Sequence, residues 1–119
     1  MTIPAKADVD TGTRDLLASL AMGDLGVLDE AAQLRETEQR ASGLDARTFS
    51  LVKIAALIAL DAPPASYMWQ VANALEAGAT PQDFAGVLRA IMPQVGGPRA
   101  MAAAPELMVA MGLELPAGP

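Results

Sequence analysis

The sequence contains no cysteine and no histidine among its 119 residues. The missing cysteines exclude disulfides, thiolate nucleophiles and cysteine-ligated zinc in this chain. The missing histidines remove the side chain most often used for proton transfer near neutral pH, and the commonest metal ligand. Proton transfer would fall to aspartate, glutamate, lysine or tyrosine, and we expect neither a bound metal nor a cofactor.

Aromatic residues and positive charges are also scarce. There are four aromatic residues (Phe49, Tyr67, Trp69 and Phe84), although 52% of the chain is hydrophobic. A composition rich in alanine, leucine and methionine favours packed helices over a β fold. With 8 basic and 14 acidic residues the net charge is −6, so we expect no binding to nucleic acid or to a membrane.

Long apolar runs are absent too. The longest, residues 54–60, is far shorter than the ~20 residues of a membrane-spanning helix. Residues 1–15 contain five charges and no apolar centre, so no signal peptide is expected. We therefore expect a cytoplasmic protein with a single domain over 1–119, in which residues 1–11 form a loose N-terminal arm.

Capping residues and chain breaks predict five to six helices. They are expected over about 13–22, 25 or 28 to 40, 46–60, 64–77, 81–95 and 98–112. Thr11 and Thr13 are expected to cap the first helix and Asp45 the third, and Thr80 with Asp83 resembles a capping box. Helices 46–60 and 64–77 are expected to form a central antiparallel hairpin around a corner at Pro63 and Pro64.

The central helix is apolar nearly all round from Leu51 to Leu60, with Lys53 as the exception. Such a helix needs neighbours on most of its sides. Five or six helices in a chain of this length would not provide them all. We therefore expect a second subunit to cover part of this helix, which makes the protein a homo-oligomer.

Three polar residues, Ser66, Gln70 and Asn73, recur at helical spacing on the second helix of the hairpin. They either line a small ligand pocket or form a solvated face that hydrogen-bonds across a subunit boundary. Tyr67 and Trp69 are separated by about 200° on the same helix. One is expected in the core and the other at an interface or pocket wall.

Three charged residues are further candidates. Lys53 either reaches solvent, pairs with an acid or binds a ligand carboxylate. Arg99 begins a helix, where backbone N–H groups favour an anion, or it forms a structural ion pair. Asp61 is a helix cap or a general base. The catalytic candidates are therefore Tyr67, Asp61 and Lys53, and the ligand-binding candidates are Ser66, Gln70, Asn73, Trp69 and Arg99.

Three stretches carry a resemblance to a known family. They are residues 44–57, residues 71–80 with Ala-Leu-Glu-Ala-Gly-Ala-Thr, and residues 87–100 with Gly-Gly-Pro-Arg-Ala. In this order they resemble the carboxymuconolactone decarboxylase family, or alkylhydroperoxidase-D-like (AhpD-like) superfamily, over about 43–112. The resemblance implies an all-α helical bundle that assembles into a homotrimer or homohexamer.

The peroxidase branch of that family uses one glutamate, two cysteines and one histidine. The resemblance places the histidine on Gln70 and the cysteines on Ser66 and Pro63, whereas the glutamate falls on Leu51 or Ser50. Every one of these groups is replaced, which argues against peroxidase activity. The decarboxylase branch is expected to keep the histidine, so Gln70 departs from that pattern too.

Two functions remain open for this cysteine-free and histidine-free subgroup. The first is a non-redox, small-molecule-binding or scaffolding homo-oligomer, with a small anion as candidate ligand. The second is a cofactor-independent decarboxylase or isomerase acting on a small carboxylated or lactone substrate. In that enzyme Lys53 or Arg99 would hold the carboxylate, and Tyr67 or Asp61 would move a proton.

Overall fold

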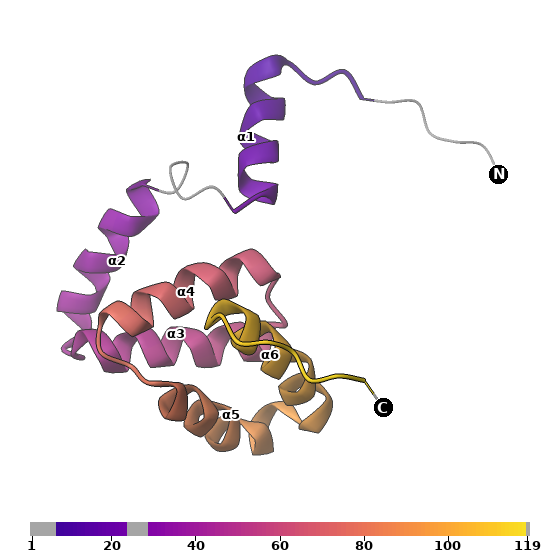
Figure 1. Ribbon diagram of the computed structural model, residues 1–119. Helices are drawn as coiled ribbons and strands as arrows, with labels where there is room; N and C mark the ends of the chain where they lie inside the picture. Colours follow the sequence, from indigo (N-terminus) through magenta and orange to yellow (C-terminus); the bar gives the residue numbers. More distant parts are fainter. Residues whose placement is uncertain (1–6, 24–28, 119) are drawn as a thin grey trace.

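A computed structural model describes residues 7–23 and 29–118, which form six helices and no strand. In chain order these are α1 (Thr11–Ala21), α2 (Asp29–Ser42), α3 (Ala46–Leu60), α4 (Pro64–Glu76), α5 (Pro81–Val95) and α6 (Gly97–Ala110). Helices α3 and α4 lie side by side and run in opposite directions (Figure 1). The predicted all-α bundle around a helical hairpin is confirmed.

Several helix ends differ from the prediction by one or two residues. Helix α1 begins at Thr11 rather than at 13, because the Asp10 carboxylate accepts the Thr13 N–H at 2.8 Å and caps the helix. Helix α6 begins at Gly97 and ends at Ala110, inside the expected end at 112. The expected start of the second helix, and residues 1–6 of the expected arm, lie outside the described residues.

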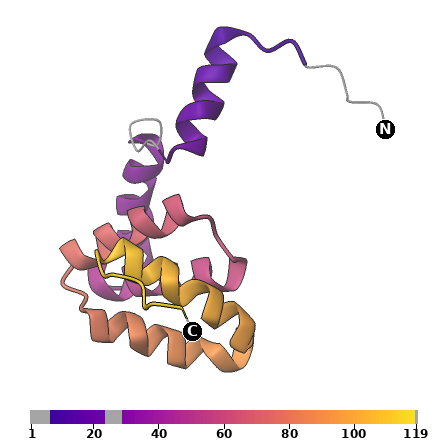
Figure 2. The same ribbon diagram turned by 45° about the vertical axis from the view of Figure 1, so that its right-hand side comes forward.

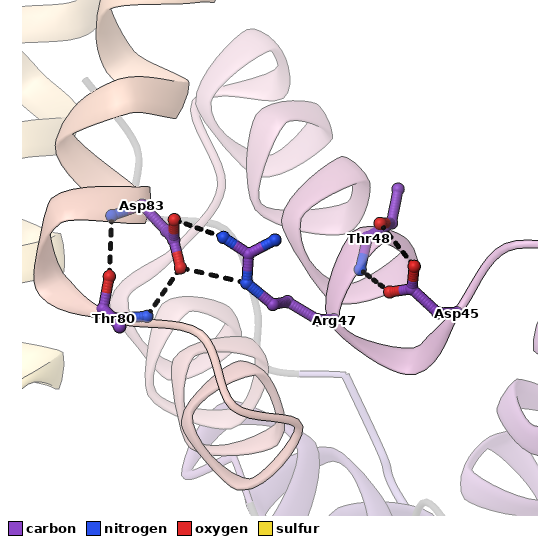
Figure 3. A network of polar contacts seen from close by, with 5 residues as sticks. All are labelled: Asp45, Arg47, Thr48, Thr80 and Asp83. Atoms are coloured by element: carbon purple, nitrogen blue, oxygen red, sulfur yellow. Dashed lines mark hydrogen bonds and ion pairs between the residues drawn. The ribbon is translucent and has the colours of Figure 1, made fainter.

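The capping residues of α3 and α5 behave as predicted, and an arginine in the first turn of α3 reaches the capping box of α5. The Asp45 carboxylate accepts the Thr48 N–H at 2.8 Å. The Thr80 N–H donates to Asp83 at 2.8 Å, and the Asp83 N–H donates to the Thr80 hydroxyl at 3.2 Å. Arg47 donates two hydrogen bonds to the same Asp83 carboxylate (Figure 3). One ion pair therefore joins the first turns of α3 and α5.

The hydrophobic core lies among α3, α4, α5 and α6, which pack on one another. Its buried members are Ile54, Ile58, Tyr67, Val71, Ala74, Ala79, Phe84, Ala103 and Leu107. Helices α1 and α2 lie outside this bundle (Figures 1 and 2). Any site formed with α2 is therefore a site at the edge of the core.

Helix α3 does not bury all of its apolar side chains. Ile54 and Ile58 are inaccessible, whereas Val52 remains 54% exposed and Leu60 is more exposed still. This surface agrees with the expectation that α3 has more apolar faces than one chain covers. Within the described ranges, no helix has the length and apolar character needed to cross a membrane.

Candidate functional site

Arg35 of α2 joins three helices at the edge of the core. Its guanidinium donates one hydrogen bond to Gln70 Oε1 of α4 at 3.0 Å and another to Ser50 Oγ of α3 at 2.8 Å. Ser50 is buried, and Gln70 and Arg35 are half-buried. The guanidinium is thus held in a fixed position by two neutral oxygen atoms.

A second cation lies close to the same place. The Lys53 ammonium is 5.0 Å from the centre of the Phe49 ring, and the Arg35 guanidinium carbon is 5.2 Å from it. A cation at this distance from an aromatic ring is stabilised by roughly 0.5–1 kcal/mol at a partly exposed position. The Phe49 ring therefore helps to hold two positive charges, one from the middle of α2 and one from the middle of α3.

These two charges lack a neutralising carboxylate at close range. Among the described residues, ion pairs within 4.0 Å join Glu36 to Arg40 and Asp83 to Arg47, and neither involves Arg35 or Lys53. Burial lowers the pKa of Arg35, but an arginine side chain stays protonated at any physiological pH. Arg35 and Lys53 therefore supply positive charge and hydrogen-bond donors, which suit an anion.

A pocket opens on each side of Arg35. The first has a volume of about 320 Å³ and is lined by Arg35, Phe49, Ser50 and Asn73, with Glu36 and Glu76 also on its wall. The second measures about 220 Å³ and is lined by Arg35, Lys53, Trp69 and Gln70, with Leu34 and Glu38. We call the second one the Arg35–Lys53 pocket. Pockets for drug-sized ligands measure roughly 300–1,000 Å³, so a ligand here would be small.

The predicted polar strip on α4 is divided among different pockets. Gln70 lines the Arg35–Lys53 pocket and Asn73 the first pocket. Ser66 lines a third hollow with Leu20 and Pro63, and Trp69 lies on the walls of both this hollow and the Arg35–Lys53 pocket. The three residues therefore do not form one pocket in this chain.

Asn73 has one feature of its own. Its Nδ2 atom is buried and has no hydrogen-bond partner among the side chains and backbone that the structure describes. A buried donor without a partner costs roughly 1–3 kcal/mol. A ligand oxygen or a water molecule in the first pocket would satisfy it.

The remaining candidates lie away from Arg35. Tyr67 belongs to the hydrophobic core, and burial, followed by the charges of Asp61 and Glu106, raises its pKa above the ordinary 10.0. Arg99 donates a hydrogen bond to the Ala59 carbonyl at 2.7 Å, and so satisfies the open C-terminal end of α3. Of the two roles expected for Arg99, an ion pair is not formed with any described residue, and an anion at the start of α6 stays a prediction.

Asp61 lies at the C-terminal end of α3. Its backbone is left-handed, with φ 53° and ψ 53°, and its N–H bonds back to Ile58 and Leu57. Aspartate tolerates this conformation better than most residues. Pro63 precedes α4 and supplies no side-chain cap. Asp61 is thus a helix cap, as one of the two alternatives held, but at the C-terminal end of α3.

Sequence reasoning missed Arg35 and left Ser50 as one of two alternatives. Arg35 belongs to a helix with charges all round, so no periodic signal identifies it as the residue that faces α3. Ser50 had a weaker signal, because it is a polar residue between apolar ones and one of two positions matched to the family glutamate. Leu51, the other position, lines the groove between α3 and α5. Ser50 accepts a hydrogen bond from Arg35, as Gln70 does.

The fold and the corner between α3 and α4 define the class: an AhpD-like helical protein that lacks the peroxidase thiols. Residues 27–107 match the model of the carboxymuconolactone decarboxylase family. This match covers more than half of the chain and includes α2, so the protein belongs to the carboxymuconolactone decarboxylase family. No curated protein and no solved structure matches the chain with significance.

Proposed function

We propose that the protein is a non-redox homo-oligomer that binds a small carboxylate in the Arg35–Lys53 pocket. The observation that carries this proposal is the state of Arg35. Its charge is half-buried and fixed by Ser50 and Gln70, and no described carboxylate lies within 4.0 Å of it. A charged donor held in this way gains most from an anionic ligand.

The walls of the pocket suggest the shape of the ligand. Trp69 and Leu34 provide apolar surface beside the two cations, and aromatic side chains bind flat apolar groups well. A carboxylate on a small, flat apolar body fits this combination. Its carboxylate would lie between Arg35 and Lys53, and its body would lie against Trp69.

The geometry favours binding over the enzymatic alternative. Both groups expected to move a proton lie elsewhere: Tyr67 in the core, and Asp61 eleven positions after Ser50 on α3. At 1.5 Å per residue, those eleven positions put Asp61 roughly 16 Å from Ser50 along the helix. Assembly of several copies is supported by the exposed apolar side chains of α3, with Val52 as an example.

The test is isothermal titration with benzoate, and with benzamide as the uncharged control ligand. We expect benzoate to bind and benzamide to bind at least ten-fold more weakly, because only benzoate carries the charge that Arg35 and Lys53 attract. Arg35→Gln should weaken benzoate binding by about ten-fold or more, as expected for a charged hydrogen bond worth about 1.5–3 kcal/mol.

The matched control is Arg40→Gln. Arg40 lies on the same helix, and its side chain is exposed in a surface pair with Glu36 at 4.0 Å. The Arg40→Gln variant should bind benzoate as the wild type does. The Arg35→Lys variant should keep part of the affinity for benzoate, because it retains the positive charge. The proposal fails if benzoate does not bind, if benzamide binds equally well, or if Arg35→Gln and Arg40→Gln behave alike.

A further inference from the structure

Helix α1 has a leucine face that its own chain leaves open. Leu16 is 49% exposed and Leu17 is 56% exposed, and α1 has no buried residue. Together with Leu20 they lie within an arc of about 100°, and Arg14 and Asp15 lie outside it. Isolated helices shorter than ~12–15 residues are marginal in water, and α1 has 11 residues. The leucine face therefore needs a covering surface.

Within the same chain α1 is held at one end only. A Cβ on Gly23 would lie 2.6 Å from the Ala65 Cβ, so the end of α1 touches the start of α4. Leu20 lies beside Pro63 in the hollow there. Beyond that point α1 projects away from the bundle in both views (Figures 1 and 2). No described helix of the chain packs along its leucine face.

A matching apolar surface lies elsewhere on the bundle. It is a groove of about 340 Å³ between α3 and α5, with no charged residue in its lining. Its apolar members are Leu51, Val52, Ala55, Val87, Ala90 and Ile91. In both views α5 lies on the opposite side of the bundle from α1 (Figures 1 and 2). With Gly23 against Ala65, α1 does not reach the groove of its own copy.

We infer that α1 of one copy packs its leucine face into the α3–α5 groove of a second copy. This inference rests on the proposed homo-oligomer and assigns its interface. Both surfaces are apolar and free of charge, so their contact buries no unpaired ion. A contact between two different patches of the same chain joins copies head to tail. Such contacts form a closed ring when the rotation from each copy to the next brings the last copy back to the first.

Two exposed substitutions test the two surfaces separately. Leu16→Asp places a charge on the leucine face, and Val52→Asp places one in the groove. The two matched controls are Leu113→Asp and Val109→Asp. The Leu113 side chain is 50% exposed and the Val109 side chain 47% exposed, and both lie outside the leucine face and the groove. By analytical ultracentrifugation we expect Leu16→Asp and Val52→Asp to be monomers, and any loss of helical circular dichroism should not exceed the 11 residues of α1. Leu113→Asp and Val109→Asp should keep the wild-type mass.

Mixing the two interface variants gives the sharper result. The Leu16→Asp chain retains an intact groove, and the Val52→Asp chain retains an intact α1. An equimolar mixture should therefore form a heterodimer through one remaining interface. If the groove paired with itself instead, Leu16→Asp alone would stay oligomeric and the mixture would form no heterodimer.

The outcomes separate this inference from the proposed function. A monomeric wild type would overturn both the homo-oligomer and this interface. An oligomeric wild type with an oligomeric Leu16→Asp variant, or with two monomeric variants that do not combine, would overturn the interface alone. Leu16→Asp should still bind benzoate like the wild type, because the Arg35–Lys53 pocket contains no residue of α1.

Discussion

A single arginine determines the chemistry of the candidate site. Arg35 is fixed by Gln70, which the family resemblance matches to a histidine, and by Ser50, one of the two positions that it matches to a glutamate. The family pair can exchange protons, whereas serine and glutamine cannot do so near neutral pH. The two side chains that hold Arg35 therefore do not relay a proton, and this agrees with the proposed binding role.

Gly23 supplies a prediction about the attachment of α1. Its φ is +71°, and an added Cβ would meet Ala65 at 2.6 Å. Gly23→Ala should therefore combine left-handed strain of about 1–2 kcal/mol with a steric conflict at α4. We expect the α1 amides to exchange hydrogen at least about five-fold faster than in the wild type.

The control for this prediction is Gly43→Ala. Gly43 has a similar φ of +74°, but open space surrounds its Cβ position. It shares the backbone strain without the conflict and lies at another junction. Equal exchange of α1 in the wild type and Gly23→Ala would show that the contact with Ala65 does not hold α1.

Asp83 leads to a prediction about pH. The Thr80 backbone hydrogen bond, with further help from Arg47 and the Thr80 hydroxyl, lowers the pKa of Asp83 below its ordinary 3.8. A carboxyl with a lowered folded pKa contributes stability above its unfolded pKa and loses it as pH falls through the folded value. The urea midpoint should therefore fall between about pH 5 and pH 2.5.

Asp83→Asn should flatten that part of the pH dependence and lower the midpoint at pH 7. The comparison variant is Asp61→Asn, since the Asp61 carboxylate is exposed and accepts no hydrogen bond from the described residues. Asp83→Asn should change the slope more than Asp61→Asn does. Parallel slopes for the wild type and Asp83→Asn would contradict the role given to Asp83.

At the level of helices, the sequence predicted contacts between residues close together in the chain better than contacts between distant residues. Asp45 and Thr80 bond to N–H groups three residues away, so a sequence pattern contains both partners. Arg35 and Gln70 are 35 positions apart, and α2 has charged residues on every side. Periodicity locates a helix face, but it does not identify which of several polar side chains meets a neighbouring helix.

The hydrogen bonds of Arg35 to Ser50 and Gln70 join α2 to α3 and α4, and this gives a prediction for the whole helix. Ser50→Ala removes the acceptor at 2.8 Å, which costs about 1 kcal/mol. The α2 amides should then exchange roughly five-fold faster, while those of α3 to α6 keep their rates. Hydrogen exchange with mass spectrometry resolves the two regions.

The control variant for α2 is Thr37→Ala. Thr37 is exposed, and among the described residues its hydroxyl bonds within its own helix, to the Gln33 carbonyl at 3.3 Å. It should not speed exchange in α2. If Thr37→Ala and Ser50→Ala have the same effect, then Arg35 does not fasten the helix.

At the level of the whole molecule, the proposed association of copies would have to overcome charge repulsion. Each copy carries a net charge of −6, whereas the two surfaces assigned to the interface contain no charge. Salt screens repulsion between exposed charges, with a Debye length of about 10 Å at 0.1 M and about 3 Å at 1 M. Salt changes the stabilisation from burying apolar side chains much less. The dissociation constant of the oligomer should therefore fall as sodium chloride rises from about 20 mM to about 500 mM.

Sedimentation equilibrium at several salt concentrations measures this directly. The Val109→Asp variant adds one negative charge outside the interface, so it should associate more weakly than the wild type at low salt and equally well at high salt. Val52→Asp should stay monomeric at every concentration, because its charge would be buried in the contact. An oligomer that dissociates as salt rises would require ion pairs between copies, and the apolar interface would then be wrong.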